Sequence, residues 1–122
     1  MRILHFEYSD FFRRVVHDMA LRQGYDYVDS RDGKDLFKML SKHDFDVILT
    51  GMELADMRVE ELLSELDNSK YRDLPVVIIT STEVNNIHTR LKHLKFNDFI
   101  LKESLNVDVL DKCLKRIMSL KN

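Results

Sequence analysis

The sequence predicts a single α/β domain with helices on both faces of a five-stranded parallel sheet. Two observations support this class: short apolar runs recur along the chain, and the segments between them carry apolar residues at helical spacing. Strands that alternate with helices are joined by right-handed crossovers, so they lie parallel in one sheet. The length of 122 residues suits one domain, which we expect to span residues 1–122.

Four of the expected strands are mostly unbroken apolar runs, a pattern typical of parallel strands that are covered on both faces. They are expected at residues 3–6, 47–49, 76–79 and 99–101. A fifth strand, at residues 25–28, alternates apolar and polar side chains. Alternation indicates that one face is partly in water, so we expect this strand at an edge of the sheet.

Five helices are expected between and after the strands. The first begins at Ser9 or Asp10 and ends at Gly24, because short polar side chains cap helix starts and glycine favours helix ends. The expected caps of the second, fourth and fifth helices are Asp32, Ser81 or Thr82, and Asn106. The expected inward-facing residues of the five helices are Phe12, Val15, Val16 and Met19; Leu36, Met39 and Leu40; Val59, Leu62, Leu63 and Leu66; Val84, Ile87, Leu91 and Leu94; and Leu110, Leu114 and Ile117.

Charge and composition exclude several classes of protein. Basic residues number 19 and acidic residues 21, which gives a net charge of −2 and no global attraction to nucleic acid. No apolar run approaches the roughly 20 residues that cross a bilayer. Cys113 is the one cysteine and lies among apolar helix residues, so we expect a core side chain in a cytoplasmic protein. His88 and His93 lie five residues apart, which is not the spacing of helical metal ligands.

The candidate functional residues follow from the expected topology. In sheets of this kind ligands bind at the carboxyl ends of the strands. The residues at those ends are Glu7 and Tyr8 after the first strand, Thr50 and Gly51 after the third, Thr80 and Ser81 after the fourth, and Lys102 after the fifth.

Four segments of the sequence together resemble the receiver domain of bacterial two-component response regulators. They read ILHFEYS (residues 3–9), DVILTGM (46–52), PVVIITS (75–81) and NDFILK (97–102). In the family these segments carry, in turn, two acids, the phosphorylated aspartate, a switch hydroxyl, and a switch aromatic with a lysine. The resemblance covers the whole chain and implies a flavodoxin-like fold, with strand order 2-1-3-4-5 and five helices, and a role in two-component signalling.

At the centre of the family's site this chain departs from the pattern. Gly51 stands at the position of the phosphate-accepting aspartate and Tyr8 at that of the second acid, so Glu7 alone remains of three carboxylates. Magnesium prefers several oxygen ligands with carboxylates among them, so Mg²⁺ binding is expected to be weak or absent. We therefore expect a pseudo-receiver: not an enzyme, without cofactor, metal or catalytic residue, and active through partner binding without phosphoryl transfer.

Two further positions differ from the family. Glu103 follows Lys102 where the family has proline, and a peptide bond that lacks proline is expected to be trans. Phe96 stands in place of an alanine and is expected to push the fourth helix or the loop after it outward.

Lys102 brings a positive charge to the altered site, and a buried charge without a partner is costly. We expect its ammonium to be paired with Glu7, Glu53 or the Tyr8 hydroxyl, which would hold the region in one state. Tyr8 is also expected to fill the space left by the missing acid and metal. Two alternatives remain open: phosphorylation of an unconventional residue, Glu53 or Thr50, and a small ligand in the vacated pocket.

The fourth helix is expected to have a basic exposed side, a basic run made by His88, Arg90, Lys92, His93 and Lys95. Such a run is most often a solvated face. In receivers, however, the face of the fourth helix, fifth strand and fifth helix is the usual surface for partners and dimers. The resemblance therefore implies an acidic protein partner or a homodimer there, with Thr80 and Phe99 as contributors. Plainer roles, a helix-capping hydroxyl for Thr80 and a core side chain for Phe99, also remain open.

Overall fold

The computed structural model describes residues 1–81 and 83–120 and contains a five-stranded parallel sheet in the order β2-β1-β3-β4-β5. The expected fold, strand order and edge position of the second strand are therefore confirmed. The expected cap Thr82 and the inward side chain expected of Val84 lie outside the described residues. The elements are β1 (Arg2–Phe6), α1 (Asp10–Arg22), β2 (Asp26–Ser30), the 3-10 helix η1 (Gly33–Asp35), α2 (Leu36–Leu40), β3 (Val47–Thr50), α3 (Val59–Asp67), β4 (Val76–Thr80), α4 (Val84–Arg90), β5 (Asp98–Leu101), the 3-10 helix η2 (Lys102–Ser104) and α5 (Val107–Leu120).

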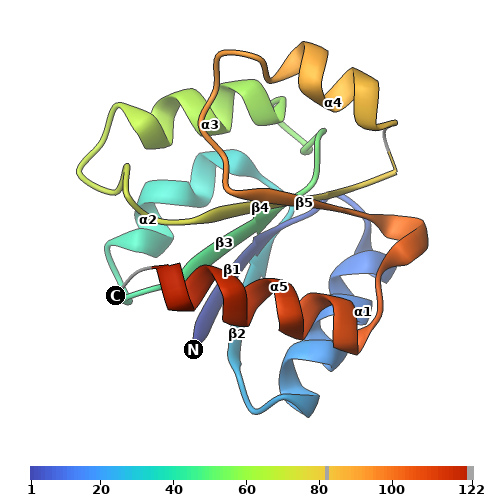
Figure 1. The fold of residues 1–122 in the computed structure, drawn as a ribbon. Helices are drawn as coiled ribbons and strands as arrows, with labels where there is room; N and C mark the ends of the chain where they lie inside the picture. The colour runs from blue at the N-terminus through green and yellow to red at the C-terminus, as the bar shows by residue number, and fades with distance from the viewer. Residues whose placement is uncertain (82, 121–122) are drawn as a thin grey trace.

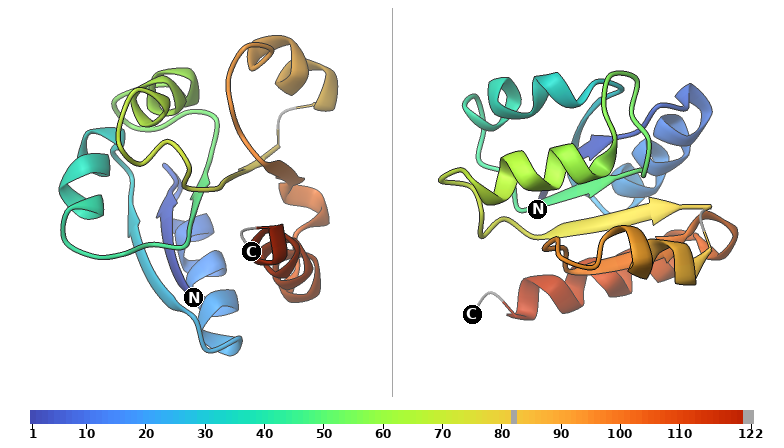
Figure 2. Two further views of the ribbon diagram at one scale, coloured as in Figure 1. Left: turned by 60° about the vertical axis from the view of Figure 1, so that its left-hand side comes forward. Right: turned by 90° about the horizontal axis from the view of Figure 1, so that it is seen from above.

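Helices cover both faces of the sheet (Figure 1; Figure 2). On one face Ile3 packs with α1 and α5, and on the other Leu4 and Phe6 pack with α2, α3 and α4. The central strands β3 and β4 are buried along their whole length, which explains why their sequences are unbroken apolar runs. Cys113 is buried on the α5 side, as expected. Of the helices described, none has the length and apolar character needed to cross a membrane.

The first and last helices begin where the sequence predicts. The Ser9 hydroxyl accepts a hydrogen bond from the Phe12 N–H at 3.2 Å, and Gly24 follows α1 with a φ of +77°. At the start of α5, Asn106 Oδ1 accepts a hydrogen bond from the Val109 N–H at 2.8 Å. Local capping rules therefore suffice for these two helices.

The fourth helix is shorter than the sequence pattern indicates. It begins after Glu83, so Ser81 is not its cap, and it ends at Arg90. Leu91 and Leu94 lie beyond its end, although the Leu91 side chain is buried at 2% exposure. The apolar residues thus recur at helical spacing beyond the end of the helix, in a non-helical segment that still packs inward, and this is why the pattern predicted a longer helix.

The second helical segment is capped by a residue that is distant in the sequence. Asp32 precedes η1 but makes no side-chain capping bond, so that expectation is wrong. Instead the Asp56 carboxylate, in the loop after β3, accepts hydrogen bonds from the N–H groups of Gly33 at 2.7 Å and Lys34 at 2.9 Å. Met57 packs on Gly33, where a β-carbon would come within 2.5 Å of the methionine sulfur. These contacts fasten the β3–α3 loop to the segment after β2.

Replacing Asp56 with alanine is expected to lower the free energy of unfolding by about 1–2 kcal/mol, because two helix-start N–H groups lose a charged acceptor. Asp32→Ala is the matched control, and its effect should stay within about 0.5 kcal/mol. Urea denaturation of both variants measures the difference. Equal losses would show that the Asp56 contacts do not stabilise the fold.

Candidate functional site

The carboxyl ends of four strands surround a cavity of about 280 Å³. All six residues predicted for the degenerate site line it, which places them together as the topology requires. The lining residues are Glu7, Tyr8, Ser9, Gly51, Met52, Glu53, Ile79, Thr80, Ser81 and Lys102.

Glu7 is the buried acid of the cavity, with 3% of its surface exposed. Its Oε2 accepts a hydrogen bond from the Ser9 N–H at 3.0 Å, and its Oε1 lies 2.9 Å from Lys102 Nζ. No described residue gives Oε1 a hydrogen bond of good angle, so attraction between opposite charges holds the contact with Lys102. The ammonium also lies 4.2 Å from the centre of the Phe12 ring. Of the three partners expected for Lys102, Glu7 is therefore the one it contacts.

The Glu7 carboxylate lies against Gly51. A β-carbon on Gly51 would come within 3.3 Å of Glu7 Oε1. This contact is tight, so a side chain at this position would require the Glu7 carboxylate to shift slightly. Thr50, the residue before, is fully buried, and its hydroxyl donates a hydrogen bond to the Gly51 carbonyl at 3.0 Å. The strand tip thus presents a bare α-carbon with a carboxylate from the neighbouring strand end beside it.

Tyr8 does not fill the cavity, so that expectation is wrong. Its side chain lines the rim and is 57% exposed, with the Arg31 guanidinium 5.3 Å from the ring centre. Successive side chains of an extended segment point to opposite sides. Because Glu7 is turned inward, Tyr8 is turned outward and leaves the cavity open.

Glu53 forms ion pairs with two arginines and not with Lys102. Its Oε1 lies 2.8 Å from Arg90 Nη1, and Arg58 approaches its other oxygen at 3.8 Å. Arg90 also donates two hydrogen bonds to Glu60, at 2.7 and 3.1 Å. These bonds lower the pKa of Glu60 and raise the pKa of Arg90. Arg90 is therefore an internal link between α4, α3 and the cavity rim, not part of an exposed basic face.

The other members of the basic run do not share one helix face, so that expectation is also wrong. The His88 ring packs edge-on against the half-buried Phe99, with ring centres 5.8 Å apart. Lys92 and His93 are exposed but lie beyond the end of α4. Lys95 donates a hydrogen bond to a carbonyl of the loop before β4. The helix ends too early to align these residues.

Two smaller expectations concerned the peptide bond after Lys102 and the position of Phe96. The described peptide bonds include no cis bond, so the bond between Lys102 and Glu103 is trans, as expected. Phe96 is half-buried and packs against the core on the α3 side. Thr80 is buried at 5% exposure at the cavity edge.

The described residues include no group of three His, Cys, Asp or Glu side chains that could hold a metal ion. At the cavity itself, the two lining carboxylates are already paired, Glu7 with Lys102 and Glu53 with Arg90. The arrangement is a set of internal ion pairs around a small polar cavity.

Two residues that were not predicted for the site, His5 and Arg13, lie near the residues that line the cavity. His5 is fully buried, and burial, followed by the nearby charges of Lys102 and Arg13, lowers its pKa from 6.5 to about 3. Arg13 donates hydrogen bonds to the carbonyls of Glu7 at 2.6 Å and Tyr8 at 3.1 Å, and so fixes the loop after β1. The signal for His5 was present in the sequence: it is a polar residue within an apolar strand.

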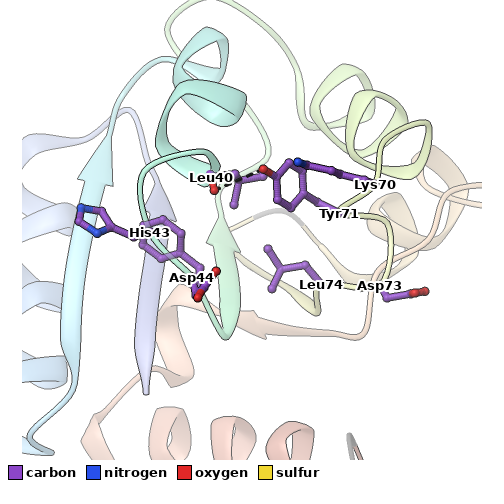
Figure 3. Close-up of a pocket in the computed structure, with 8 residues that line it drawn as sticks. Leu40, His43, Asp44, Lys70, Tyr71, Asp73 and Leu74 are labelled. Atoms are coloured by element: carbon purple, nitrogen blue, oxygen red, sulfur yellow. Dashed lines mark hydrogen bonds between the residues drawn. The ribbon is translucent and has the colours of Figure 1, made fainter.

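A second cavity, of about 290 Å³, lies among residues that precede β3 and β4, at the amino edge of the sheet (Figure 3). The Tyr71 hydroxyl donates a hydrogen bond to the Leu40 carbonyl at 3.4 Å, and Lys70 lies over the Tyr71 ring. The charged residues around it are mixed: His43 and Asp44 lie on one side of it and Lys70 and Asp73 on the other, so each side carries a basic and an acidic residue (Figure 3). This cavity has no charge preference and lies away from Gly51.

Comparisons with known proteins agree with the fold. The family model described as "Response regulator receiver domain" matches residues 3–115. Over 104 residues the chain is 26% identical to the transcriptional regulatory protein CrdR of Helicobacter pylori; the match covers 85% of this chain but only 48%, about half, of that relative.

Solved structures are similar over almost the whole chain. The receiver domain of the sensor histidine kinase PA1611 from Pseudomonas aeruginosa, which has a magnesium ion coordinated in its active-site cleft, gives a TM-score of 0.87 at 19% identity and covers 97% of both chains. The chemotaxis response regulator CheY4 of Vibrio cholerae gives 0.83 at 22% identity, covering 95% of this chain and 97% of that one. At these identities the structural match supports the fold alone.

Proposed function

The chain belongs to the response regulator receiver family, and from this premise we propose that it is a pseudo-receiver, a regulatory or scaffolding module that binds protein partners without being phosphorylated. Receiver domains work through protein partners in two-component systems and are generally signalling modules rather than enzymes.

One observation carries the proposal: the strand tip at Gly51 has no side chain to accept a phosphoryl group. The nearby alternatives are each engaged or enclosed. Thr50 is fully buried with its hydroxyl bonded to the Gly51 carbonyl, Glu7 is buried beside Lys102, and Glu53 is held by Arg90. Phosphoryl transfer depends on close alignment of its nucleophile, and none of these groups is presented to an incoming donor as a strand-tip aspartate would be.

We also propose that Mg²⁺ binds weakly or not at all. A magnesium ion prefers several oxygen ligands in near-octahedral geometry. Here the ammonium of Lys102 already lies beside the Glu7 carboxylate at 2.9 Å, and a divalent cation would have to displace it against electrostatic repulsion. The pairing of Glu7 with Lys102 therefore supports weak metal binding.

Incubation with acetyl phosphate and Mg²⁺ is expected to leave the mass of the native protein unchanged, because the reactive carboxylate is missing. Intact-mass spectrometry measures this directly. A receiver that carries the acceptor aspartate, treated in parallel, controls for the donor. A stoichiometric phosphate adduct on the native chain would favour the rival function, an unconventional acceptor. Loss of that adduct in Glu53→Gln or Thr50→Val would then identify the residue.

For the partner we propose a protein bound at the face of α4, β5 and α5. His88 and Phe99 form an edge-to-face aromatic pair there, and exposed Lys92 adds positive charge nearby. An acidic protein surface complements this charge; a second copy of the chain is the alternative. A pull-down with the native chain and with a His88→Glu/Lys92→Glu variant tests the face, and recovery of the same proteins by both would rule it out.

A second candidate function is the sensing of a small ligand in the vacated cavity. The observation in its favour is that Tyr8 leaves the cavity of about 280 Å³ open at the edge of the sheet where such folds bind ligands. A thermal-shift screen of small polar metabolites tests it. A cavity variant, Gly51→Leu, should abolish any shift that arises from binding at this site.

A further inference from the structure

We propose that Arg90 is an ionic latch: its guanidinium, shared between Glu53 and Glu60, fixes α4 in one position and couples that position to the rim of the Gly51 cavity. The elements joined in this way are α4, α3 and the loop after β3 (Figure 1).

Among the described side chains, α4 has few anchors besides the latch. It spans only seven residues, Val84–Arg90, and isolated helices of this length are not stable in water. Within the described side chains its fully buried anchor is Ile87, with Leu91 just past its end. By comparison, α3 and α5 each bury four side chains. Among the described side chains, apolar packing therefore holds α4 less firmly than α3 or α5.

The latch has the geometry of a strong ion pair. Arg90 meets Glu60 through two N–H groups, Nε and Nη2, and Glu53 through the third nitrogen at 2.8 Å. Bidentate hydrogen bonds between a guanidinium and a carboxylate are stronger and more directional than single hydrogen bonds. Arg90 and Glu60 are also largely shielded, with side chains 28% and 32% exposed, so water and salt screen them less than a surface pair.

The latch reaches the cavity through Glu53. This residue is two positions after Gly51 and lines the cavity, while its carboxylate is bonded to α4. A cationic group that enters the rim and recruits Glu53 would take one of the two carboxylates from Arg90 and loosen α4. Occupancy of the cavity and the position of α4 would then be linked without any covalent modification.

Hydrogen exchange of the backbone amides, measured residue by residue in the full chain, tests the latch. In Arg90→Met, which keeps an unbranched side chain and removes the charge, the amides of residues 87–91 should exchange about tenfold faster, since a shielded ion pair is lost. Exchange in β1, β3 and α5 should not change. Arg116→Met, which removes an α5 cation paired with Asp98 of β5, is the matched control and should leave α4 unaffected.

Salt gives a second measurement on the native chain, independent of any effect of the substitution on folding. The Glu53 side chain of the latch is 57% exposed, so salt can screen its pairing with Arg90. High salt should therefore accelerate exchange in α4 of the native chain and have little effect in Arg90→Met. Unchanged α4 exchange in Arg90→Met, or an equal rise across every element, would overturn the proposal. The measurement uses no phosphodonor, so its outcome is separate from that of the phosphorylation experiment.

Discussion

Replacing Lys102 with methionine is expected to lower the free energy of unfolding by about 3 kcal/mol at neutral pH. Glu7 is 3% exposed, and the negative charge on its Oε1 is compensated by the Lys102 ammonium at 2.9 Å. Without that charge, a buried carboxylate is left with only the Ser9 N–H. The full cost of breaking a buried pair is reduced here because Lys102 is 25% exposed and water can enter. Urea denaturation followed by circular dichroism measures the loss.

The double variant Glu7→Gln/Lys102→Met separates charge from packing. It removes both charges and keeps the shape of the pair, so it should recover most of the stability lost in the single variant. If the double variant is as unstable as Lys102→Met, the lost contact between the lysine and the Phe12 ring is the main cause. The surface substitution Lys112→Met, on an exposed ion pair of α5, should have little effect.

The course of the chain could be predicted because local rules determine it. Unbroken apolar runs mark β3 and β4, which are buried on both faces, and the Ser9 and Asn106 caps use backbone groups three residues away. The predicted cap of the second helical segment was wrong because the residue that caps it, Asp56, comes from a loop more than twenty residues later. No pattern within a short window contains that contact.

The site was predicted in its membership but not in its pairings. Topology alone brings the strand ends together, so the residues that line the cavity followed from the order of the strands. Which carboxylate meets which cation depends on side-chain direction, and that is set by the fold: Glu7 turns inward to Lys102, and Glu53 turns to Arg90 on α4. The prediction of a basic helix face failed for a related reason: α4 ends at Arg90, and spacing along the sequence could not show where the helix ends.

The surroundings of His5 are expected to make the stability of this fold depend on pH. It is fully buried in β1, and its Nδ1 lies 2.7 Å from the Tyr27 hydroxyl oxygen, which in turn donates to the Arg13 carbonyl at 3.0 Å. Its Nε2 is buried with no hydrogen-bond partner among the described residues. The ring is therefore accommodated as a neutral group, and protonation would place an N–H and a charge where nothing accepts them, near Lys102 and Arg13.

Stability is expected to fall by about 2 kcal/mol between about pH 7 and about pH 5 because of His5. Its pKa is about 3 in the folded chain and 6.5 as a model value. In that interval the unfolded chain binds the proton and the folded chain does not, so acid favours unfolding; the contribution is present above 6.5 and is lost as the pH falls toward 3. Urea denaturation at several pH values measures the slope. His5→Leu should flatten it, whereas His93→Gln, at an exposed histidine, should not. If His5→Leu keeps the native slope, other groups cause the acid sensitivity and the buried ring is not its source.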